Sequence, residues 1–405
     1  MLKCGLLGKK LGHSYSPAIH ARLGDYFYGL FEKEEAELED FLKNGDWDGL
    51  NVTIPYKKTV LPYCAQISDI ARETGSVNTL VKRPDGTIFG DNTDAPGFAA
   101  LVRKTGIAVE NEKVLILGSG GAGAAVSAAL KRMKAGIVVI GRNAENNYGN
   151  ISKHADAAVI VNTTPVGMYP DNLDSPLDLS VFPFLKGVID VVYNPALTGI
   201  LLQAEERGIP HANGLYMLAA QARRSSELFT GTKIPGSVVE EITNELASSM
   251  KNIILIGMPG SGKSAVAEAL GKATGRPVFD SDEEIVKKAG MSITAIFEKY
   301  GEEHFRELET EVLEELGKAS GTIVSTGGGC VTKERNYPLL HQNGKIVWIK
   351  REISILTREG RPLSAGNLQE MYEKRRPMYE RFADVVVGND KTVAECVDRI
   401  TQDDP

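Results

Sequence analysis

Two charged residues, Lys57 and Asp94, stand near the ends of predicted strands and are of the types that move or steer a proton. Lys57 follows the segment Asn51–Tyr56, and Asp94 ends the run Gly90–Asp94. Hydroxyl and amide side chains occupy comparable places at Ser14, Ser16, Thr53 and Asn78. Because lysine can stabilise a developing alkoxide and hydroxyls can bind a carboxylate, this set suits a polyhydroxylated acid whose carbonyl group is reduced. Each residue alone is also an ordinary cap or turn residue.

A glycine-rich loop that could hold a dinucleotide follows the predicted strand Lys113–Leu117, with its glycines at Gly118, Gly120, Gly121 and Gly123. The first glycine permits a tight turn, the second lets the backbone approach a pyrophosphate, and the next helix offers free N–H groups. The following predicted strand is succeeded by Arg142 rather than an acidic residue, which favours the 2′-phosphate of NADP. The alternatives are a purely steric glycine turn and a surface arginine.

A second, chemically different loop reads GMPGSGKS and follows the predicted strand Asn252–Ile256. Its nucleotide-binding residues are Gly257, Gly260, Ser261, Gly262, Lys263 and Ser264. In such a loop the backbone N–H groups wrap phosphates, the lysine neutralises the β and γ groups, and the serine hydroxyl reaches magnesium. With a strand before it and a helix after it, the loop predicts binding of ATP and Mg²⁺.

Residues beyond this loop predict a small anionic phosphoryl acceptor. Asp280 and Asp282 follow a predicted strand, so one carboxylate can reach the metal while the other faces an acceptor hydroxyl. The glycines Gly327–Gly329 allow a ligand to approach the backbone closely. Positive charges exceed what magnesium-ATP needs, at Arg306, Arg361 and Arg375. Two further arginines are interpreted as surface charge, Arg351 and Arg381.

The elements that must position these residues alternate short apolar runs with amphipathic stretches, the pattern of an α/β protein. Several runs lead straight into a glycine turn and a helical pattern, as a parallel sheet requires. The predicted strands are Lys3–Leu7, Gly49–Val52, Lys113–Leu117, Gly136–Ile140, Ala157–Val161, Gly187–Val191, Asn252–Ile256, Thr322–Ser325, Lys345–Ile349 and Val385–Val387. An amphipathic helix is expected over Ser237–Leu246.

Length and composition describe a globular protein of two or three domains, with 405 residues of which 42% are apolar and 24% charged. A net charge of -7 gives no general attraction to nucleic acid or an anionic membrane. The 4 cysteines lack metal-site spacing and indicate reduced thiols. Without an apolar run of membrane-span length or a signal peptide, the expected location is the cytoplasm. The oligomeric state stays open, a homo-oligomer included.

The first part of the chain, about residues 1–246, resembles shikimate dehydrogenase through the phrases HSYSP, NVTIPYK, GSVNT, DNTDAPG, VNTTPVGM, DVVYNPALT and NGLYMLAAQA, which occur in family order. The resemblance implies NADPH-dependent reduction of 3-dehydroshikimate to shikimate, with Lys57 and Asp94 as the catalytic pair. It implies substrate contacts from Ser14, Ser16, Thr53, Lys57, Asn78, Asp94, Tyr193 and Gln221. Beside the four loop glycines, it implies NADP contacts from Arg142, Asn143, Thr163, Gly214 and Met217.

This sequence departs from that family after the second strand of the nucleotide fold. The family usually has Asn-Arg-Thr there, whereas Gly141-Arg142-Asn143 keeps only the arginine, and the segment 144–154 is shorter than usual. The departure predicts a more open adenosine side of the NADP pocket.

About residues 251–400 resemble shikimate kinase, through GxxxxGKS, DSD, FRELE, GGG, RPL and RRPMY in that order. The resemblance assigns shikimate to Asp282, Arg306, Gly328, Gly329 and Arg375, where the alignment of Arg375 could slip by one onto Arg376. It assigns nucleotide and Mg²⁺ to Lys263, Ser264 and Asp280, a lid role to Arg361 and adenine stacking to Arg358. Lys263, Asp282 and Arg361 are the implied catalytic set.

Together the two resemblances predict a bifunctional enzyme that makes shikimate and phosphorylates it to shikimate 3-phosphate, in aromatic amino-acid biosynthesis. The expected organisation is an α/β substrate lobe over 1–95, to which helices near 214–246 return. A Rossmann-like NADP domain over 96–246 follows, then a linker at 247–251 and a P-loop, NMP-kinase-like α/β domain with a central parallel sheet over 252–405. One alternative is a quinate-type dehydrogenase fused to a kinase for another hydroxy acid, which Arg142 disfavours. Another is a regulatory module that senses shikimate, which Lys57 and Asp94 disfavour.

Overall fold

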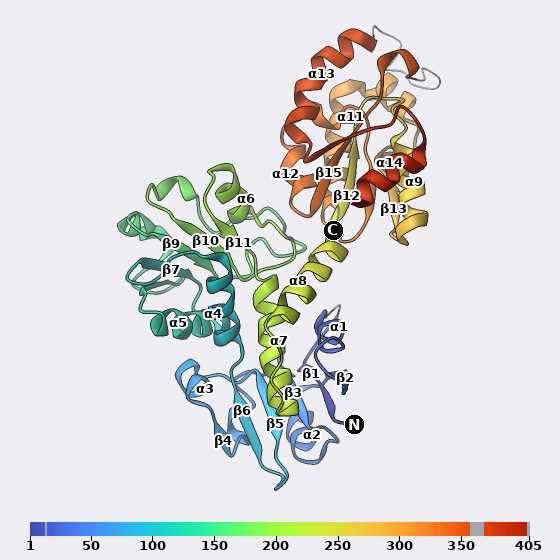
Figure 1. Ribbon diagram of the computed structural model, residues 1–405. Helices are drawn as coiled ribbons and strands as arrows, with labels where there is room; N and C mark the ends of the chain where they lie inside the picture. The colour runs from blue at the N-terminus through green and yellow to red at the C-terminus, as the bar shows by residue number, and fades with distance from the viewer. Residues whose placement is uncertain (13, 357–367, 403–405) are drawn as a thin grey trace. The chain divides into compact units, whose positions relative to one another are not determined.

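The computed structural model describes residues 1–12, 14–356 and 368–402 of the chain. It divides into two compact units (Figure 1). The first consists of Met1–Met168, Asp174–Tyr193 and Gly199–Glu245. The second consists of Tyr169–Leu173, Asn194–Thr198 and Leu246–Pro405. The predicted Arg358 and Arg361 fall outside the described residues.

A six-stranded sheet begins the first unit, in the order β2-β1-β3-β5-β6-β4. Its strands are β1 (Lys3–Gly8), β2 (Phe27–Glu32), β3 (Gly49–Val52), β4 (Gln66–Ile67), β5 (Thr79–Lys82) and β6 (Ile88–Asp91). Its short helices are α1 (Ser16–His20), α2 (Leu38–Asn44) and α3 (Asp69–Thr74). The sheet is mixed rather than wholly parallel, because β5 runs antiparallel to both β3 and β6. The parallel register of Leu7 with Val52 places the ends of β1 and β3 side by side.

The second sheet of this unit is parallel throughout, in the order β11-β10-β9-β7-β8. Its strands are β7 (Lys113–Leu117), β8 (Gly136–Ile140), β9 (Val159–Asn162), β10 (Gly187–Asp190) and β11 (His211–Ala212). It is accompanied by α4 (Asp94–Thr105), α5 (Gly121–Arg132) and α6 (Gly199–Glu206). The strands predicted from the sequence at Lys113–Leu117 and Gly136–Ile140 have the same bounds as β7 and β8. The apolar run of β7 is buried, as a parallel strand requires.

Helices α4 and α7 (Leu215–Thr230) pack closely and hold site residues at fixed places. A Cβ added at Gly97 would lie 3.1 Å from the carbonyl oxygen of Met217, so any larger residue there would have to shift the two helices apart. The next helix, α8, spans Ser237–Met250. The sequence prediction ended it too early, since the N–H of Lys251 still donates to the carbonyl of Ala247 and Met250 is buried. No helix among the described residues is long and apolar enough to cross a membrane.

The second unit contains a parallel sheet in the order β13-β14-β12-β15-β16. Its strands are β12 (Asn252–Ile256), β13 (Val278–Asp280), β14 (Ile323–Ser325), β15 (Gly344–Lys350) and β16 (Val385–Gly388). Its helices are α9 (Lys263–Thr274), α10 (Ser281–Ala289), α11 (Ile293–Gly317), α12 (Asn336–His341), α13 (Leu368–Phe382) and α14 (Val393–Gln402). Because β12 is central, its carboxyl end lies at the point where chain connections diverge, a common ligand site in such sheets.

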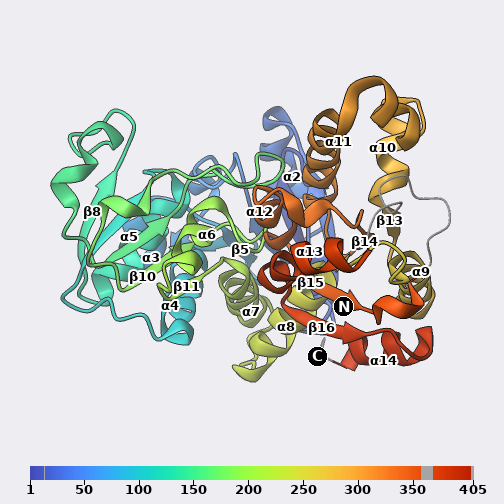
Figure 2. The same ribbon diagram turned by 90° about the horizontal axis from the view of Figure 1, so that it is seen from above.

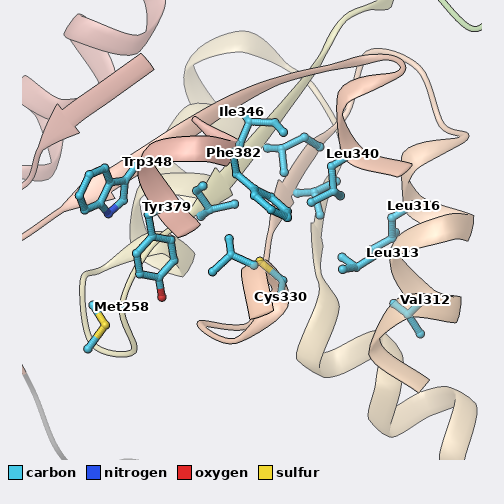
Figure 3. Close-up of a cluster of buried hydrophobic side chains, with 14 of the residues drawn as sticks. Met258, Val312, Leu313, Leu316, Cys330, Leu340, Ile346, Trp348, Tyr379 and Phe382 are labelled. Carbon is cyan, nitrogen blue, oxygen red and sulfur yellow. The ribbon is translucent and has the colours of Figure 1, made fainter. Parts of the chain in front are cut away.

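Alternate residues of the central strand β12 face opposite layers of helices, as strand geometry requires. Ile254 and Ile256 belong to the core beneath α11 and α13, part of which Figure 3 shows around Phe382 and Tyr379. Ile253 and Leu255 belong to a second core with α9 and α14. Figure 2 shows α9 and α14 together on one side of this sheet, with α11 and α12 on the other.

Candidate active sites

A cavity of about 240 Å³ lies at the ends of β1 and β3 in the first unit. It is lined by Leu6, Ser14, Ser16, His20, Asn51, Val52, Thr53, Lys57, Asn78, Tyr193, Leu218, Gln221 and Ala222. Every residue predicted to bind the dehydrogenase substrate is in this lining except Asp94, which reaches the cavity through Lys57. The residues come from both sheets' loops and from α7, so folding brings distant sequence phrases together.

The side chains of Lys57 and Asp94 form an ion pair, with 2.7 Å between Nζ and Oδ2. Asp94 is the first residue of α4, where a carboxylate is stabilised by the positive end of the helix, and the N–H of Asp94 donates to Asn92. Its side chain is only 9% exposed, whereas that of Lys57 is 25% exposed and lines the cavity. Asp94 can therefore hold the ammonium group toward a ligand without itself facing solvent.

Asn78 and Gln221 form one polar wall of this cavity. The Asn78 amide Nδ2 donates to Oε1 of Gln221 at 3.2 Å, and its Oδ1 accepts from the N–H of Thr93 at 2.7 Å. Asn78 is buried, so these partners fix which end of the amide faces its neighbours. At the start of α1 the N–H of Ser16 donates to the hydroxyl of Ser14 at 3.2 Å. This hydrogen bond holds the two predicted carboxylate-binding serines together.

Sequence reasoning missed His20 and Asn51, which lie deeper in the same cavity. The Asn51 side chain accepts from the hydroxyl of Tyr28 at 2.8 Å and donates to that of Ser225 at 2.7 Å. The His20 ring stacks on Tyr28, with ring centres 3.9 Å apart, and burial lowers the pKa of His20 to about 3. Asn51 stood in the phrase NVTIPYK and could have been chosen there, whereas a lone histidine in a five-residue helix carries no spacing signal.

The dinucleotide loop has the geometry that its glycines predicted. Gly118 adopts a positive φ of 104°, and a Cβ at Gly123 would lie 2.3 Å from the carbonyl oxygen of Gly118. A Cβ at Gly120 or Gly121 would meet nothing within 4 Å, which leaves open space at the N-terminus of α5. The hydroxyl of Thr163 donates to the carbonyl of Leu117 and braces the loop. These features fit a bound pyrophosphate.

The other predicted NADP residues lie in two different environments. Arg142 and Asn143 are exposed in the turn after β8, where Arg142 lies near Tyr148 and forms no ion pair with the described residues. The shortened segment beyond them folds back, as the N–H of Gly141 donates to the carbonyl of Asn146. Gly214 instead packs on the backbone of Val191, and Met217 is buried in the core of the second sheet. Neither of these last two residues lines the substrate cavity.

The second unit has a cavity of about 210 Å³ at the carboxyl ends of its central strands. Its lining includes residues predicted for the phosphoryl acceptor, the nucleotide and the metal: Lys263, Ser264, Asp280, Asp282, Arg306, Gly328, Gly329 and Arg375. Apolar side chains complete the wall, from Ile293, Phe297 and Phe305. Positive, negative and apolar surfaces thus face one small volume, as a hydroxylated carboxylic acid requires.

The phosphate loop starts at the end of β12 and turns into α9 through glycines with positive φ. Within it, the ammonium group of Lys263 donates to the carbonyl oxygens of Gly257 and Met258 at 2.9 and 3.1 Å. The hydroxyl of Ser264 donates to Oδ2 of Asp280 at 2.9 Å. Mg²⁺ in such sites takes one or two side-chain oxygens and completes its shell with phosphate oxygens and water, so Ser264 and Asp280 fit the ion.

Arg306 and Glu309 form a buried ion pair one helical turn apart on α11. Arg306 Nη1 donates to Oε2 of Glu309 at 2.7 Å, while Oε1 of Glu309 has no partner among the described residues. Burial raises the pKa of Glu309 to about 7, although Arg306 opposes the shift. A Cβ at Gly329 would lie 2.3 Å from Arg306 Nη1, so that glycine makes room for the guanidinium. Glu309 was missed from the sequence, although its spacing from Arg306 carried the signal.

The structure distinguishes between Arg375 and Arg376. Arg375 lines the cavity and donates to the carbonyl of Gly328 at 3.1 Å, an acceptor that it shares with the hydroxyl of Tyr379. Arg376 pairs with Glu380 and its side chain is 58% exposed. The ring of Tyr379 stacks on that of Trp348 in the core that Figure 3 shows. Arg375 is therefore the arginine of this pair that faces the cavity.

Known families match both units of the chain. The model described as shikimate dehydrogenase substrate binding domain matches residues 6–80, and that described as shikimate kinase matches residues 259–404. A shikimate dehydrogenase (NADP(+)) of Clostridium perfringens (strain 13 / Type A) is 34% identical over 264 residues, which cover 60% of this chain and 97% of the relative. One from Methanococcus maripaludis is 36% identical over 258 residues, covering 56% and 92%.

Solved structures agree with these relatives. The crystal structure of a chorismate mutase/shikimate 5-dehydrogenase fusion protein from Clostridium acetobutylicum has a TM-score of 0.58 and 38% identity, covering 61% of this chain and 97% of its own. The shikimate 5-dehydrogenase of Thermus thermophilus in complex with NADP(H) and shikimate has a TM-score of 0.56 and 32% identity, covering 60% and 99%. A quinate dehydrogenase from Corynebacterium glutamicum in complex with NAD has a TM-score of 0.56 and 28% identity, covering 60% and 99%.

Proposed function

Because the chain belongs to the shikimate dehydrogenase family and ends in a shikimate kinase domain, we propose that it reduces 3-dehydroshikimate to shikimate and then phosphorylates shikimate to shikimate 3-phosphate. It is a bifunctional shikimate pathway enzyme, an oxidoreductase that uses NADP and a transferase that uses ATP with Mg²⁺. The fold class and both family resemblances predicted from the sequence are thereby confirmed. The direction and order of the two reactions belong to the proposal.

The observation that carries the first reaction is the ion pair of Lys57 and Asp94 beside the first cavity. NADPH, when bound at the loop of Gly118–Gly123, supplies a hydride to the carbonyl carbon. The ammonium group of Lys57 stabilises the negative charge that develops on the carbonyl oxygen and donates its proton there. Asp94 accepts a hydrogen bond from the ammonium group of Lys57 and orients it toward the substrate.

The remaining lining residues of this cavity place the substrate. Ser14 and Ser16 offer hydroxyl donors to the carboxylate, while Asn78 and Gln221 are placed to hold ring hydroxyls. Thr53 and Tyr193 complete the wall. On the cofactor side, we propose that Arg142 contacts the 2′-phosphate of NADP, with Asn143 and Thr163 at the loop. Gly214, packed on the backbone of Val191, and Met217, in the core of the second sheet, contact the nicotinamide end of the cofactor.

In the kinase, the two arginines of one cavity support an acidic acceptor. Arg306 and Arg375 bind the carboxylate of shikimate, and the carboxylate of Asp282 accepts from the hydroxyl that is phosphorylated. Lys263 leaves its carbonyl partners to bind the phosphates, and Ser264 with Asp280 holds Mg²⁺. The roles of Arg361 and Arg358 stay predictions.

We also propose the domain bounds of the chain and its cellular location. We assign 1–95 and the helices near 214–246 to the substrate lobe, 96–246 to the NADP domain and 252–405 to the kinase. A division between the contact units at Glu245 and Leu246 supports the start of the kinase, although Tyr169–Leu173 and Asn194–Thr198 group with the second unit rather than with the NADP domain. The acidic net charge and the four free cysteines support a cytoplasmic enzyme whose partners are small molecules, without nucleic acid or membrane.

The test is a single reaction mixture of the purified chain with 3-dehydroshikimate, NADPH and magnesium-ATP, followed by mass spectrometry. We expect shikimate 3-phosphate, with oxidised NADP in matching amount. Shikimate without phosphate would refute the kinase's acceptor, and phosphorylation only when shikimate is added directly would refute the dehydrogenase assignment. If neither product forms under either condition, the proposed function is wrong.

A further inference from the structure

Arg351, which the sequence indicated to be surface charge, has an environment unlike that of a surface arginine. It follows β15 directly and is partly buried, and its Nε is buried with no hydrogen-bond partner among the described residues. The other arginine interpreted in the same way, Arg381, is 62% exposed and donates to Glu334. A buried guanidinium nitrogen without a partner is costly, which indicates that Arg351 has a ligand in the working protein.

The position of Arg351 is set by the phosphate loop. Strands β12 and β15 are parallel neighbours, with Ile256 in register with Trp348, so their carboxyl ends meet at one edge. A Cβ at Gly257 would lie 2.5 Å from the carbonyl oxygen of Ile349, and one at Gly262 would lie 3.9 Å from Arg351 Nη1. The guanidinium is therefore beside the backbone that wraps phosphates.

On its other side Arg351 borders a separate cavity of about 660 Å³. The polar lining includes Glu352, Gln369 and Asp390, and Tyr372 adds an aromatic ring. This volume is within the range of ordinary small-ligand sites and is distinct from the acceptor cavity that holds Arg306 and Arg375. Arg351 thus lies between a phosphate loop and a space large enough for a nucleoside.

We propose that Arg351 binds the phosphate chain of the phosphoryl donor, where that chain leaves the loop of Gly257–Ser264 toward the larger cavity. The forked donors of a guanidinium match phosphate oxygens, and its charge offsets charge that Lys263 alone does not neutralise. The ligand chemistry is a nucleoside di- or triphosphate, and the recognised part is the phosphate chain rather than the base. The inference rests on the proposed kinase function.

The experiment compares three variants of the full chain, Arg351→Ala, Arg351→Lys and the control Arg381→Ala. Calorimetric titration with magnesium-ADP and with adenosine measures binding. We expect Arg351→Ala to weaken magnesium-ADP binding about ten- to a hundredfold, the range for a charged hydrogen bond, while adenosine binding changes little. Arg351→Lys should recover part of the loss, and Arg381→Ala should bind as the unchanged protein does. In kinase assays the KM for ATP should rise while the KM for shikimate holds.

The dehydrogenase rate of the same preparations normalises the amount of protein, because that reaction uses the other unit. An unchanged KM for shikimate reports that the kinase unit of each variant is folded. If Arg351→Ala perturbs the fold, the comparison of Arg351→Lys with the unchanged protein still measures the effect of the guanidinium on magnesium-ADP affinity. Equal magnesium-ADP affinity in the unchanged protein and both Arg351 variants overturns the inference while leaving the kinase intact. An equal loss for adenosine and magnesium-ADP also overturns it, since the side chain would then contact the base. If the unchanged protein binds no ADP, the proposed kinase function itself fails, and the inference fails with it.

Discussion

Arg306 Nη1 lies 2.7 Å from one carboxylate oxygen of Glu309, while the other oxygen of Glu309 is buried with no partner among the described residues. Both side chains of the pair are buried, at 4% and 0% exposed. Burial of the unpartnered oxygen favours the neutral form of Glu309, whereas the ion pair of the other oxygen with Arg306 favours the charged form. The charge on Glu309 therefore determines how strongly its carboxylate competes with an acidic ligand for Arg306.

The stability of the kinase unit should depend on pH through Glu309. Its pKa is raised to about 7 in the folded protein from an ordinary value of 4.5, chiefly by burial. A raised folded pKa means a stabilising contribution that is complete below pH 4.5 and is lost as the pH rises through 7. At about 1.4 kcal/mol per pKa unit, the loss is roughly 3 kcal/mol.

Hydrogen-exchange mass spectrometry of peptides from β12 and β15, at pH 5 and pH 8, measures this effect after correction for intrinsic exchange. We expect Glu309→Gln to abolish most of the difference. The control is Glu302→Gln, which also removes a partner of Arg306 but at a side chain that is 58% exposed. An unchanged pH dependence in Glu309→Gln would show that another group carries it.

Removing Lys57 should separate the two activities. We expect Lys57→Ala to lower the rate of 3-dehydroshikimate reduction by about a hundred- to ten-thousandfold, the range for loss of a positioned proton donor. The kinase rate should stay unchanged, because Lys57 lies in the other unit. Lys58→Ala is the matched control, since Lys58 is the adjacent, exposed lysine. Both rates are measured on one preparation, and undiminished reduction would contradict the catalytic role of Lys57.

Two neighbouring arginines of α13 should differ sharply in their effect on shikimate binding. Arg375 faces the cavity beside Gly328, whereas Arg376 pairs with Glu380 at the surface. We expect Arg375→Ala to raise the kinase KM for shikimate about ten- to a hundredfold, as for a lost charged hydrogen bond, and Arg376→Ala to leave it within about twofold. Steady-state kinetics at saturating ATP measure both. The reverse ranking would mean that the cavity does not bind the acceptor.

Selectivity between NADP and NAD should depend on Arg142. Arg142 is exposed in its turn, so water and salt weaken its attraction to the 2′-phosphate. We therefore expect Arg142→Ala to raise the KM for NADPH by only about tenfold. The KM for NADH should change little, because NADH lacks that phosphate. The effect should shrink at high salt. A similar rise for both cofactors would point to a structural role in the turn instead.

The sequence predicted the buried parallel strands better than the edges. Runs such as Lys113–Leu117 and Asn252–Ile256 are apolar on both faces, and the structure matches them residue for residue. By contrast β2 is half exposed, and β4 and β11 have two residues each, so they carry little pattern. Residues tied to a recognisable phrase, such as Lys57 and Arg375, were found. Arg351 was not, because its significance lies in a buried nitrogen without a partner among the described residues, which only the folded chain displays. Glu309 was also missed, although its i,i+3 spacing from Arg306 was visible in the sequence.

Two glycines of one loop should respond differently to the same substitution. A Cβ at Gly123 would lie 2.3 Å from the carbonyl oxygen of Gly118, so Gly123→Ala must displace α5 from β7 and should destabilise the first unit. A Cβ at Gly121 would meet nothing within 4 Å, and alanine is tolerated at the start of a helix. Gly121→Ala should therefore leave the fold intact.

The open space at Gly121 is nevertheless where a pyrophosphate would approach the backbone. We expect Gly121→Ala to weaken NADP binding while its thermal unfolding without ligand matches that of the unchanged protein. Gly123→Ala should lower the unfolding temperature of the first unit, with the kinase activity of the same sample as the internal reference. Calorimetry with and without NADP separates the two effects. If Gly121→Ala bound NADP normally, the cofactor's phosphates would have to lie elsewhere than at the N-terminus of α5.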